Sequence, residues 1–101
     1  MGIIKKNTNG SFVIDAKAIE DIAQIACDKV SGVIPYKKDK RYVDFKNNNG
    51  DYELEVFVKL VKGCDVEATC HRAQTAIYEK IFEMTEISLK NIDINIQGFE
   101  G

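Results

Sequence analysis

Long apolar runs are missing from the sequence, and no stretch approaches the roughly 18 consecutive apolar residues that a membrane-spanning helix needs. A basic excess is missing too, because 14 lysines and arginines stand against 16 aspartates and glutamates and leave a net charge of -2. Proteins dedicated to duplex nucleic acid normally carry such an excess to neutralise phosphates. The sequence therefore predicts no direct membrane insertion and no DNA partner.

Cysteine is scarce, at three residues in 101, and the spacing of Cys27, Cys64 and Cys70 shows no disulfide framework. An odd number of cysteines without such a framework is typical of a reducing compartment. Residues 1–6 carry two lysines after a short apolar run but no extended apolar stretch, which is unlike an ordinary secretory signal. We therefore expect a cytoplasmic protein that reaches a membrane only through a partner.

The common catalytic motifs are also missing: the chain has no glycine-rich phosphate loop, no Gly-x-Ser-x-Gly and no His-Glu-x-x-His. Cys64 precedes a predicted helix, where a thiol can become reactive, but the single histidine, His71, lies about two helical turns away. Cys64, Cys70 and His71 also suggest zinc, yet no Cys-x-x-Cys pair exists, and Cys70 is better interpreted as a small buried hydrophobe. We expect no enzyme, no cofactor and no metal, and keep a ligand- or metal-binding domain as an alternative.

The most regular pattern in the chain runs from residue 66 to residue 97. In its first part, apolar residues recur at intervals of three or four, which places them along one stripe of an α-helix. The members of this stripe are Val66, Cys70, Ala73, Ile77, Ile81 and Met84. In its last part, isoleucines at 92, 94 and 96 alternate with polar residues, as in a strand with one buried and one exposed face. A long amphipathic helix followed by such a strand needs a sheet to pack against.

A second amphipathic helix is predicted from residue 16 to residue 30. Asp15 stands at its N-cap position, where a carboxylate accepts the free amide protons of the first turn, and Gly32 follows its end. Its apolar stripe consists of Ile19, Ile22, Ala23, Ala26 and Val30. Before it, residues 12–14 form a short β-prone run. Residues 1–10 end in a turn-favouring Asn-Thr-Asn-Gly cluster and are interpreted as a mobile leader.

Two strands are predicted between the helices, over residues 42–46 and 52–62. The Asn-Gly step between them suits a hairpin turn with positive φ angles. Leu54, Val56, Val58 and Leu60 alternate onto one face of the second strand. The segment around Pro35 is extended at most, because proline disfavours helix at its own position and at the residue before it.

This order predicts an α+β, two-layer domain with a mixed sheet of three or four strands and two helices on one face. The predicted element order is β-α-β-β-α-β, with a short first strand. The final strand, helix and strand imply a parallel crossover connection. We expect one domain over residues 11–101, after the leader over residues 1–10.

If both helices cover one face of the sheet, the opposite face is left open and becomes a candidate protein interface. Its predicted members are Glu55, Phe57, Lys59, Val61, Asp93, Asn95 and Gln97. Phe57 is the expected exposed anchor, with Lys59 and Asp93 steering the approach of a second copy or of another protein. A second candidate is the helix face that carries His71, Tyr78 and Phe82.

The basic cluster of the chain lies at residues 37–41. Its cations are Lys37, Lys38, Lys40 and Arg41. Asp39 interrupts the run and the chain as a whole is acidic, so a solvated loop is the favoured interpretation. The alternative is an anionic contact with RNA, lipid headgroups or an acidic partner, to which the flanking Tyr36 and Tyr42 would add stacking surfaces.

Several segments of the chain together form a familiar pattern. In the first half they are Val-Ile-Asp at residues 13–15, the helical stretch from residue 19 to residue 23, and Val-Ser-Gly-Val at residues 30–33. In the second half they are Glu-Met-Thr at residues 83–85 and the alternation that ends in Gln-Gly-Phe at residues 97–99. These segments resemble the opening and the closing helix and strand of the alkaline shock protein family, the envelope stress response proteins of Gram-positive bacteria. The resemblance covers about residues 12–100 and consists mostly of hydrophobic positions.

The resemblance implies a non-enzymatic scaffold or adaptor linked to cell-envelope homeostasis through protein–protein interaction. Some members of the family are held at the membrane by a separate anchor protein, which implies a membrane-anchored partner here. This chain lacks the acidic or low-complexity tail of the longer members. The alternative function is a small RNA-binding module that uses the basic loop, although little affinity for RNA is expected.

Overall fold

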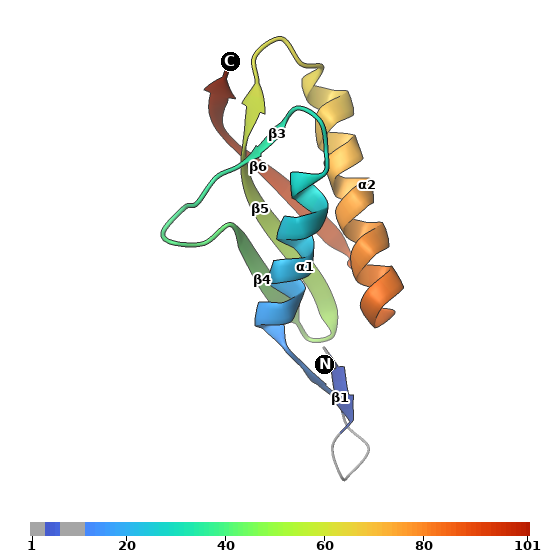
Figure 1. Cartoon of the computed structure of the whole chain (residues 1–101). Coiled ribbons are helices and arrows are strands. Elements are labelled where there is room, and N and C mark those ends of the chain that lie inside the picture. Colours follow the sequence, from blue (N-terminus) through green and yellow to red (C-terminus); the bar gives the residue numbers. More distant parts are fainter. Residues whose placement is uncertain (1–3, 7–11) are drawn as a thin grey trace.

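Two helices lie side by side against one face of a four-stranded sheet in the computed structural model (Figure 1). The structure describes residues 4–6 and 12–101, with side chains from Asp15 onward. Its elements in chain order are β1 (Ile4–Lys6), β2 (Phe12–Ile14), α1 (Ala16–Asp28), β3 (Val33–Pro35), β4 (Val43–Asn48), β5 (Asp51–Val61), α2 (Val66–Thr85) and β6 (Asn91–Glu100). The predicted α+β class, the mixed sheet and the placement of both helices on one face are confirmed.

The eleven-residue strand β5 is the centre of the sheet. On one side it pairs in parallel with β6. The two strands are connected along the chain by α2, the crossover helix that the sequence predicts. On the other side it pairs antiparallel with β4 over its first half and with β3 near its end. β3 and β4 therefore lie one after the other along the same side of β5. The segment that connects β3 to β4 leaves the sheet and returns to it at Phe57 of β5.

The core lies between β5 and the helices, as the alternation along β5 predicts. Leu54, Val56, Val58 and Leu60 are at most 2% exposed and pack in one cluster with the buried stripes of both helices. Burial of this apolar surface is the main stabilising contribution to the fold.

The cap that the sequence predicts at Asp15 and the predicted hairpin turn are present, and the second helix has a cap of the same kind. Asp15 and Asp65 are the N-caps of α1 and α2, and each carboxylate accepts a hydrogen bond from the backbone N–H three residues later. α1 ends at Asp28, two residues before the predicted end. Asn49 and Gly50, at φ 53° and 93°, form a two-residue hairpin turn between β4 and β5, which requires positive φ at both positions.

The stripe of α2 was predicted correctly at its centre and wrongly at its ends. Ala73, Ile77 and Ile81 are fully buried, but Val66 and Met84 are 40% and 52% exposed. Two threonines occupy the buried ends instead. Thr85 Oγ1 donates to the carbonyl of Ile81 at 2.6 Å and accepts from the N–H of Ile87 at 3.1 Å. Thr69 Oγ1 accepts from Arg72 at 3.1 Å. These hydrogen bonds allow hydroxyls to be buried at positions that hydrophobicity alone assigns to the surface.

Three strand predictions need correction. The segment 33–35, expected to be extended at most, is the sheet strand β3. The short strand at residues 12–14 pairs with β1 in a separate two-stranded sheet and not with the main sheet. β1 itself falls inside the expected leader, while residues 1–3 and 7–10 of that leader lie outside the described residues, so its mobility stays a prediction.

Candidate interaction surface

The face of the sheet turned away from the helices is here called the open sheet face. Its members come from alternate positions of β5 and β6, which direct their side chains opposite to the core-facing residues. They are Glu55, Phe57, Lys59, Val61, Asp93, Asn95, Gln97 and Glu100. The structure thus brings all of the predicted interface residues onto one face and adds Glu100, because a bulge between Val58 and Lys59 shifts the register of β6.

Polar side chains on the open sheet face are linked to one another. Gln97 Nε2 donates to Asn95 Oδ1, and Asn95 Nδ2 donates to Glu55 Oε2 at 2.9 Å. Lys46 Nζ of β4 lies 4.0 Å from the other oxygen of the same glutamate. This chain of contacts crosses three strands and holds the side chains in fixed positions, which lowers the ordering cost of any contact made to them.

Lys59 has partners that the sequence did not predict. Its ammonium lies 3.1 Å from Glu100 Oε1 and 5.4 Å from the centre of the Tyr36 ring. The expected steering of a partner by Lys59 and Asp93 stays a prediction. Asp93 lines a shallow hollow with Lys46 and Glu53.

Phe57 lies on the open sheet face but is only 7% exposed, so the expectation of an exposed aromatic anchor is wrong. The chain segment between β3 and β4 returns at this position: the N–H of Tyr36 donates to the Phe57 carbonyl at 3.1 Å, and the Phe57 N–H donates to the Tyr42 carbonyl at 3.0 Å. The ammonium of Lys38 lies 5.3 Å from the centre of the Phe57 ring, within the range of a cation–π contact. The apolar ring is thus covered by its own chain.

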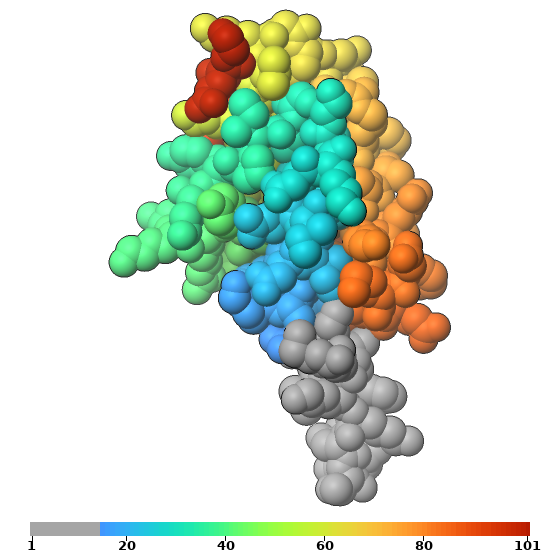
Figure 2. Space-filling model, in the orientation of Figure 1, coloured from blue at the N-terminus to red at the C-terminus, as the bar shows by residue number. Residues whose placement is uncertain are grey.

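The basic loop has a defined structure, here called the basic hairpin, over residues 36–42. Lys38 and Arg41 exchange two backbone hydrogen bonds, of 2.7 and 2.8 Å. Asp39 and Lys40 between them have φ angles of 50° and 69°, the left-handed region that a tight hairpin turn requires and that non-glycine residues rarely adopt. The hairpin projects from the sheet at the left of Figures 1 and 2, in the cyan-green part of the chain, and its four cations are exposed.

The four cations of the basic hairpin have different surroundings. Arg41 pairs with Asp44 at 3.3 Å, and Lys37 lies 5.7 Å from the centre of the Tyr42 ring. Among the residues described, no carboxylate lies within ion-pair distance of Lys37, Lys38 or Lys40. The hairpin therefore presents three ammonium groups whose charge is not neutralised by a close partner.

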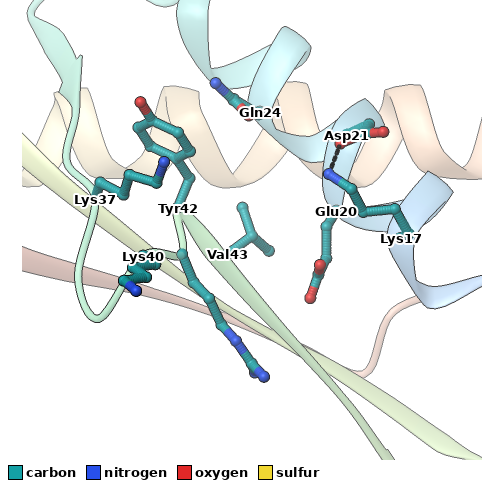
Figure 3. Close-up of a pocket in the computed structure, with 9 residues that line it drawn as sticks. Lys17, Glu20, Asp21, Gln24, Lys37, Lys40, Tyr42 and Val43 are labelled. Carbon is teal, nitrogen blue, oxygen red and sulfur yellow. Dashed lines mark hydrogen bonds and ion pairs between the residues drawn. The ribbon is translucent and has the colours of Figure 1, made fainter.

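A hollow of about 290 Å³ separates the basic hairpin from α1 (Figure 3). Lys37, Lys40 and Arg41 line one side, and Glu20 and Asp21 of α1 line the other. The carboxylate of Asp21 is engaged by Lys17 at 2.9 Å, as the dashed line in Figure 3 marks. Cations exceed carboxylates around this hollow, so its net potential favours an anionic group.

The three cysteines differ in burial: Cys27 is buried, while Cys64 and Cys70 are half-buried. Burial raises the pKa of the Cys27 thiol to about 11, and burial also raises the pKa of Cys70. Both thiols are thus protonated and weakly nucleophilic at neutral pH. Cys70 is half-buried against the core, and His71 is exposed on α2. Within residues 4–6 and 12–101, no three His, Cys, Asp or Glu side chains gather as a metal-binding group.

The second predicted interface, on α2, is exposed. Tyr78 and Phe82 are 38% and 46% exposed, and their rings stack with centroids 6.4 Å apart. His71 lies on the same side, beside a hollow shared with Tyr78. None of the helices described is long and apolar enough to cross a membrane.

Comparison with known proteins reveals a likeness in fold. No family model matches the chain, and no curated protein matches it. A solved structure, the zinc form of a MamM CTD variant, superposes with a TM-score of 0.63 at 16% sequence identity, covering 84% of this chain and 87% of that one. At this identity the likeness bears on the α+β fold alone.

Proposed function

We propose that this protein is a non-enzymatic adaptor of the alkaline shock protein kind, which binds an acidic segment of another protein along the basic hairpin and onto the neighbouring open sheet face. The observation that carries this proposal is the set of three exposed ammonium groups, Lys37, Lys38 and Lys40, without a close carboxylate in the described part of the chain. Lys38 stands at the sheet face that neither helix covers, while Lys37 and Lys40 line the hollow beside α1.

Two features support a protein partner for this surface. The hairpin is held in place by backbone bonds to Phe57 and by lysine–aromatic contacts, so its cations are positioned before binding. The neighbouring amides of Asn95 and Gln97 offer hydrogen-bond donors and acceptors of the kind found at the polar rim of an interface. An extended acidic segment would meet both groups at once.

The resemblance to the alkaline shock protein family supports the wider role. It points to a partner that is itself membrane-anchored and to a task in cell-envelope homeostasis. Deleting the gene in its host is expected to sensitise cells to envelope stress. Unchanged growth under such stress would remove this part of the proposal without touching the binding surface.

A photo-crosslinking residue at position 40 is expected to capture a protein partner in native cells, while the same residue at the exposed position of Glu83 on α2 is expected to capture no protein other than a second copy of this chain. With the captured partner purified, Lys37→Glu combined with Lys40→Glu should weaken its binding about tenfold or more, because two attractive charges become repulsive. Lys38 is kept, since it covers Phe57.

The matched control changes charge equally on the helix side, with Lys29→Glu combined with Lys80→Glu. Binding of the partner should be nearly unaffected by this control. The proposal fails if the control weakens binding as much as the hairpin variant, or if the purified partner does not bind the parent chain.

For RNA, we expect an affinity weaker than about 100 µM at physiological salt, since four local cations on an acidic chain release few counterions. The rings of Tyr36 and Tyr42, which base stacking would need, are half-buried and each already faces a lysine. Fluorescence anisotropy with a labelled single-stranded RNA measures this. Tight binding that is lost in the Lys37→Glu, Lys40→Glu variant would replace the adaptor with an RNA-binding module.

A further inference from the structure

β6 forms one edge of the sheet and is a long edge strand, at ten residues. Within the described residues it pairs with β5 alone, along nine register positions. Its ten residues include no lysine, arginine or proline, the residues that commonly blunt an exposed edge. The opposite edge, by contrast, is divided between two short strands and interrupted by the basic hairpin. The long edge of β6 is therefore a template on which another strand can add.

Beside the first residues of β6, α2 and the sheet edge line a shallow, open hollow of about 420 Å³. Its apolar lining comes from Tyr78, Leu89 and Ile92, and the stacked ring of Phe82 extends the apolar surface along α2. The hollow lies on the helix side of the sheet. An apolar side chain presented by a strand added to β6 would reach it.

Phe99 is such a side chain at the other end of the same strand. It is 49% exposed, and its register partner is Leu60, which is fully buried under the helices. Neighbouring residues in register share a face of the sheet, so Phe99 also points to the helix side. β6 thus carries an exposed aromatic ring at its end and an apolar hollow at its start.

We propose that β6 pairs antiparallel with β6 of a second copy of this chain, about a two-fold axis at Asn95, and that Phe99 of each copy enters the hollow of the other. In this register Ile94 lies opposite Ile96 of the second copy, and Asp93 lies opposite Gln97. Isoleucine thus meets isoleucine on the helix side and polar residues meet on the open side, with no like charges opposed. The bulge after Ile96 brings Phe99 opposite Ile92, which lines the hollow.

Charge at the two ends of the strand favours a second copy in antiparallel orientation. Lys90 precedes β6 and Glu100 ends it, and both are exposed. An antiparallel copy brings each of these charges next to its opposite, whereas a parallel copy would bring like charges together. The edge is therefore complementary to itself, as a two-fold interface requires. The sheet would run continuously through both copies, and their α2 helices would meet across the axis.

Light scattering on the purified full chain should give twice the 11.4 kDa mass across micromolar concentrations. Phe99→Glu should raise the dissociation constant about tenfold or more, because it places a charge in the hollow of the partner copy. Ile25→Glu is the matched control, at an apolar residue of α1 that is similarly exposed, at 51% against 49% for Phe99, and it should leave the dimer unchanged. A monomer at all concentrations, or equal weakening by both variants, overturns the proposal.

A charge exchange separates contacts between copies from contacts within one copy. Inside the chain, Lys90 pairs with Asp51 and Glu100 pairs with Lys59, each at 3.1 Å. Lys90→Glu and Glu100→Lys should each weaken the dimer. The double exchange restores the attraction between copies but neither internal pair, so recovery of the dimer supports the proposed orientation and its absence contradicts it.

A cysteine at position 95 tests the axis itself. Across a two-fold axis at that residue the two Cα atoms lie about 4.5–5.5 Å apart, within the range of a disulfide. Asn95→Cys should thus form a covalent dimer on mild oxidation. Asp93→Cys, whose two copies would stand roughly 14 Å apart, should not exceed the parent chain with its native cysteines. Equal crosslinking of the two variants overturns the register.

Discussion

Ile77→Ala is expected to lower the free energy of unfolding by about 2 to 5 kcal/mol, which is a large part of the stability of a domain of this size. Ile77 lies in the middle of α2 and is fully buried in the cluster between the helices and β5. Alanine removes three carbons from a site whose neighbours come from several elements. They cannot collapse fully into the space, so a cavity remains and adds to the lost burial.

Urea unfolding followed by circular dichroism measures this loss as a lower midpoint with an unchanged slope. Ile25→Ala is the matched control: it makes the same chemical change on the other helix, at a side chain that is 51% exposed. Its effect should stay within about 0.5 kcal/mol, as for surface substitutions in general. A loss for Ile77→Ala as small as that expected of the control would show that Ile77 is not in the core. Ile94→Ala, at a half-buried residue, should fall between them.

Phe57→Ala is expected to cost about 3 kcal/mol, at the low end of the range for buried phenylalanine, because its cover is a surface hairpin and not the main core. Phe57→Lys should cost more, since it places an ammonium beside Lys38 in a space with little access to water. Both variants should show lower urea midpoints. The basic hairpin should also become more susceptible to proteolysis, because its backbone is anchored at this residue.

Val61→Lys provides the control for position and chemistry, being on the same strand and the same face but 39% exposed. It should change stability by no more than about 0.5 kcal/mol. If Phe57→Lys were as stable as the parent chain, the hairpin would not cover the ring in solution. Because a change at Phe57 alters the fold, loss of a partner in that variant would say little about the interface, and the hairpin lysines are the better probes.

Local patterns in the sequence determined the elements and the core. The aspartates at positions 15 and 65 cap the helices because an N-cap needs only a carboxylate next to free amide protons. The Asn-Gly turn follows from the positive φ angles that these two residues tolerate. The alternation along β5 and the central stripe of α2 identify buried residues because each reflects a single regular geometry. Together with the order of the elements, these patterns were enough to predict the two-layer α+β fold.

Contacts between segments far apart in the sequence determined the burial of Phe57, the shape of the basic hairpin and the burial of two threonines. No local sequence pattern predicts these contacts. Phe57 alternates with core residues and so was predicted to be exposed, but residues 36–42 return to cover it. The basic hairpin lacks the glycine that usually marks such a turn, and its shape depends on the flanking strands that hold its two ends against β5. Thr69 and Thr85 are buried because their hydroxyls find hydrogen-bond partners in the folded chain. Whether a side chain is buried depends on which other segments pack against it in the folded protein. For these residues, only the tertiary structure determines those contacts.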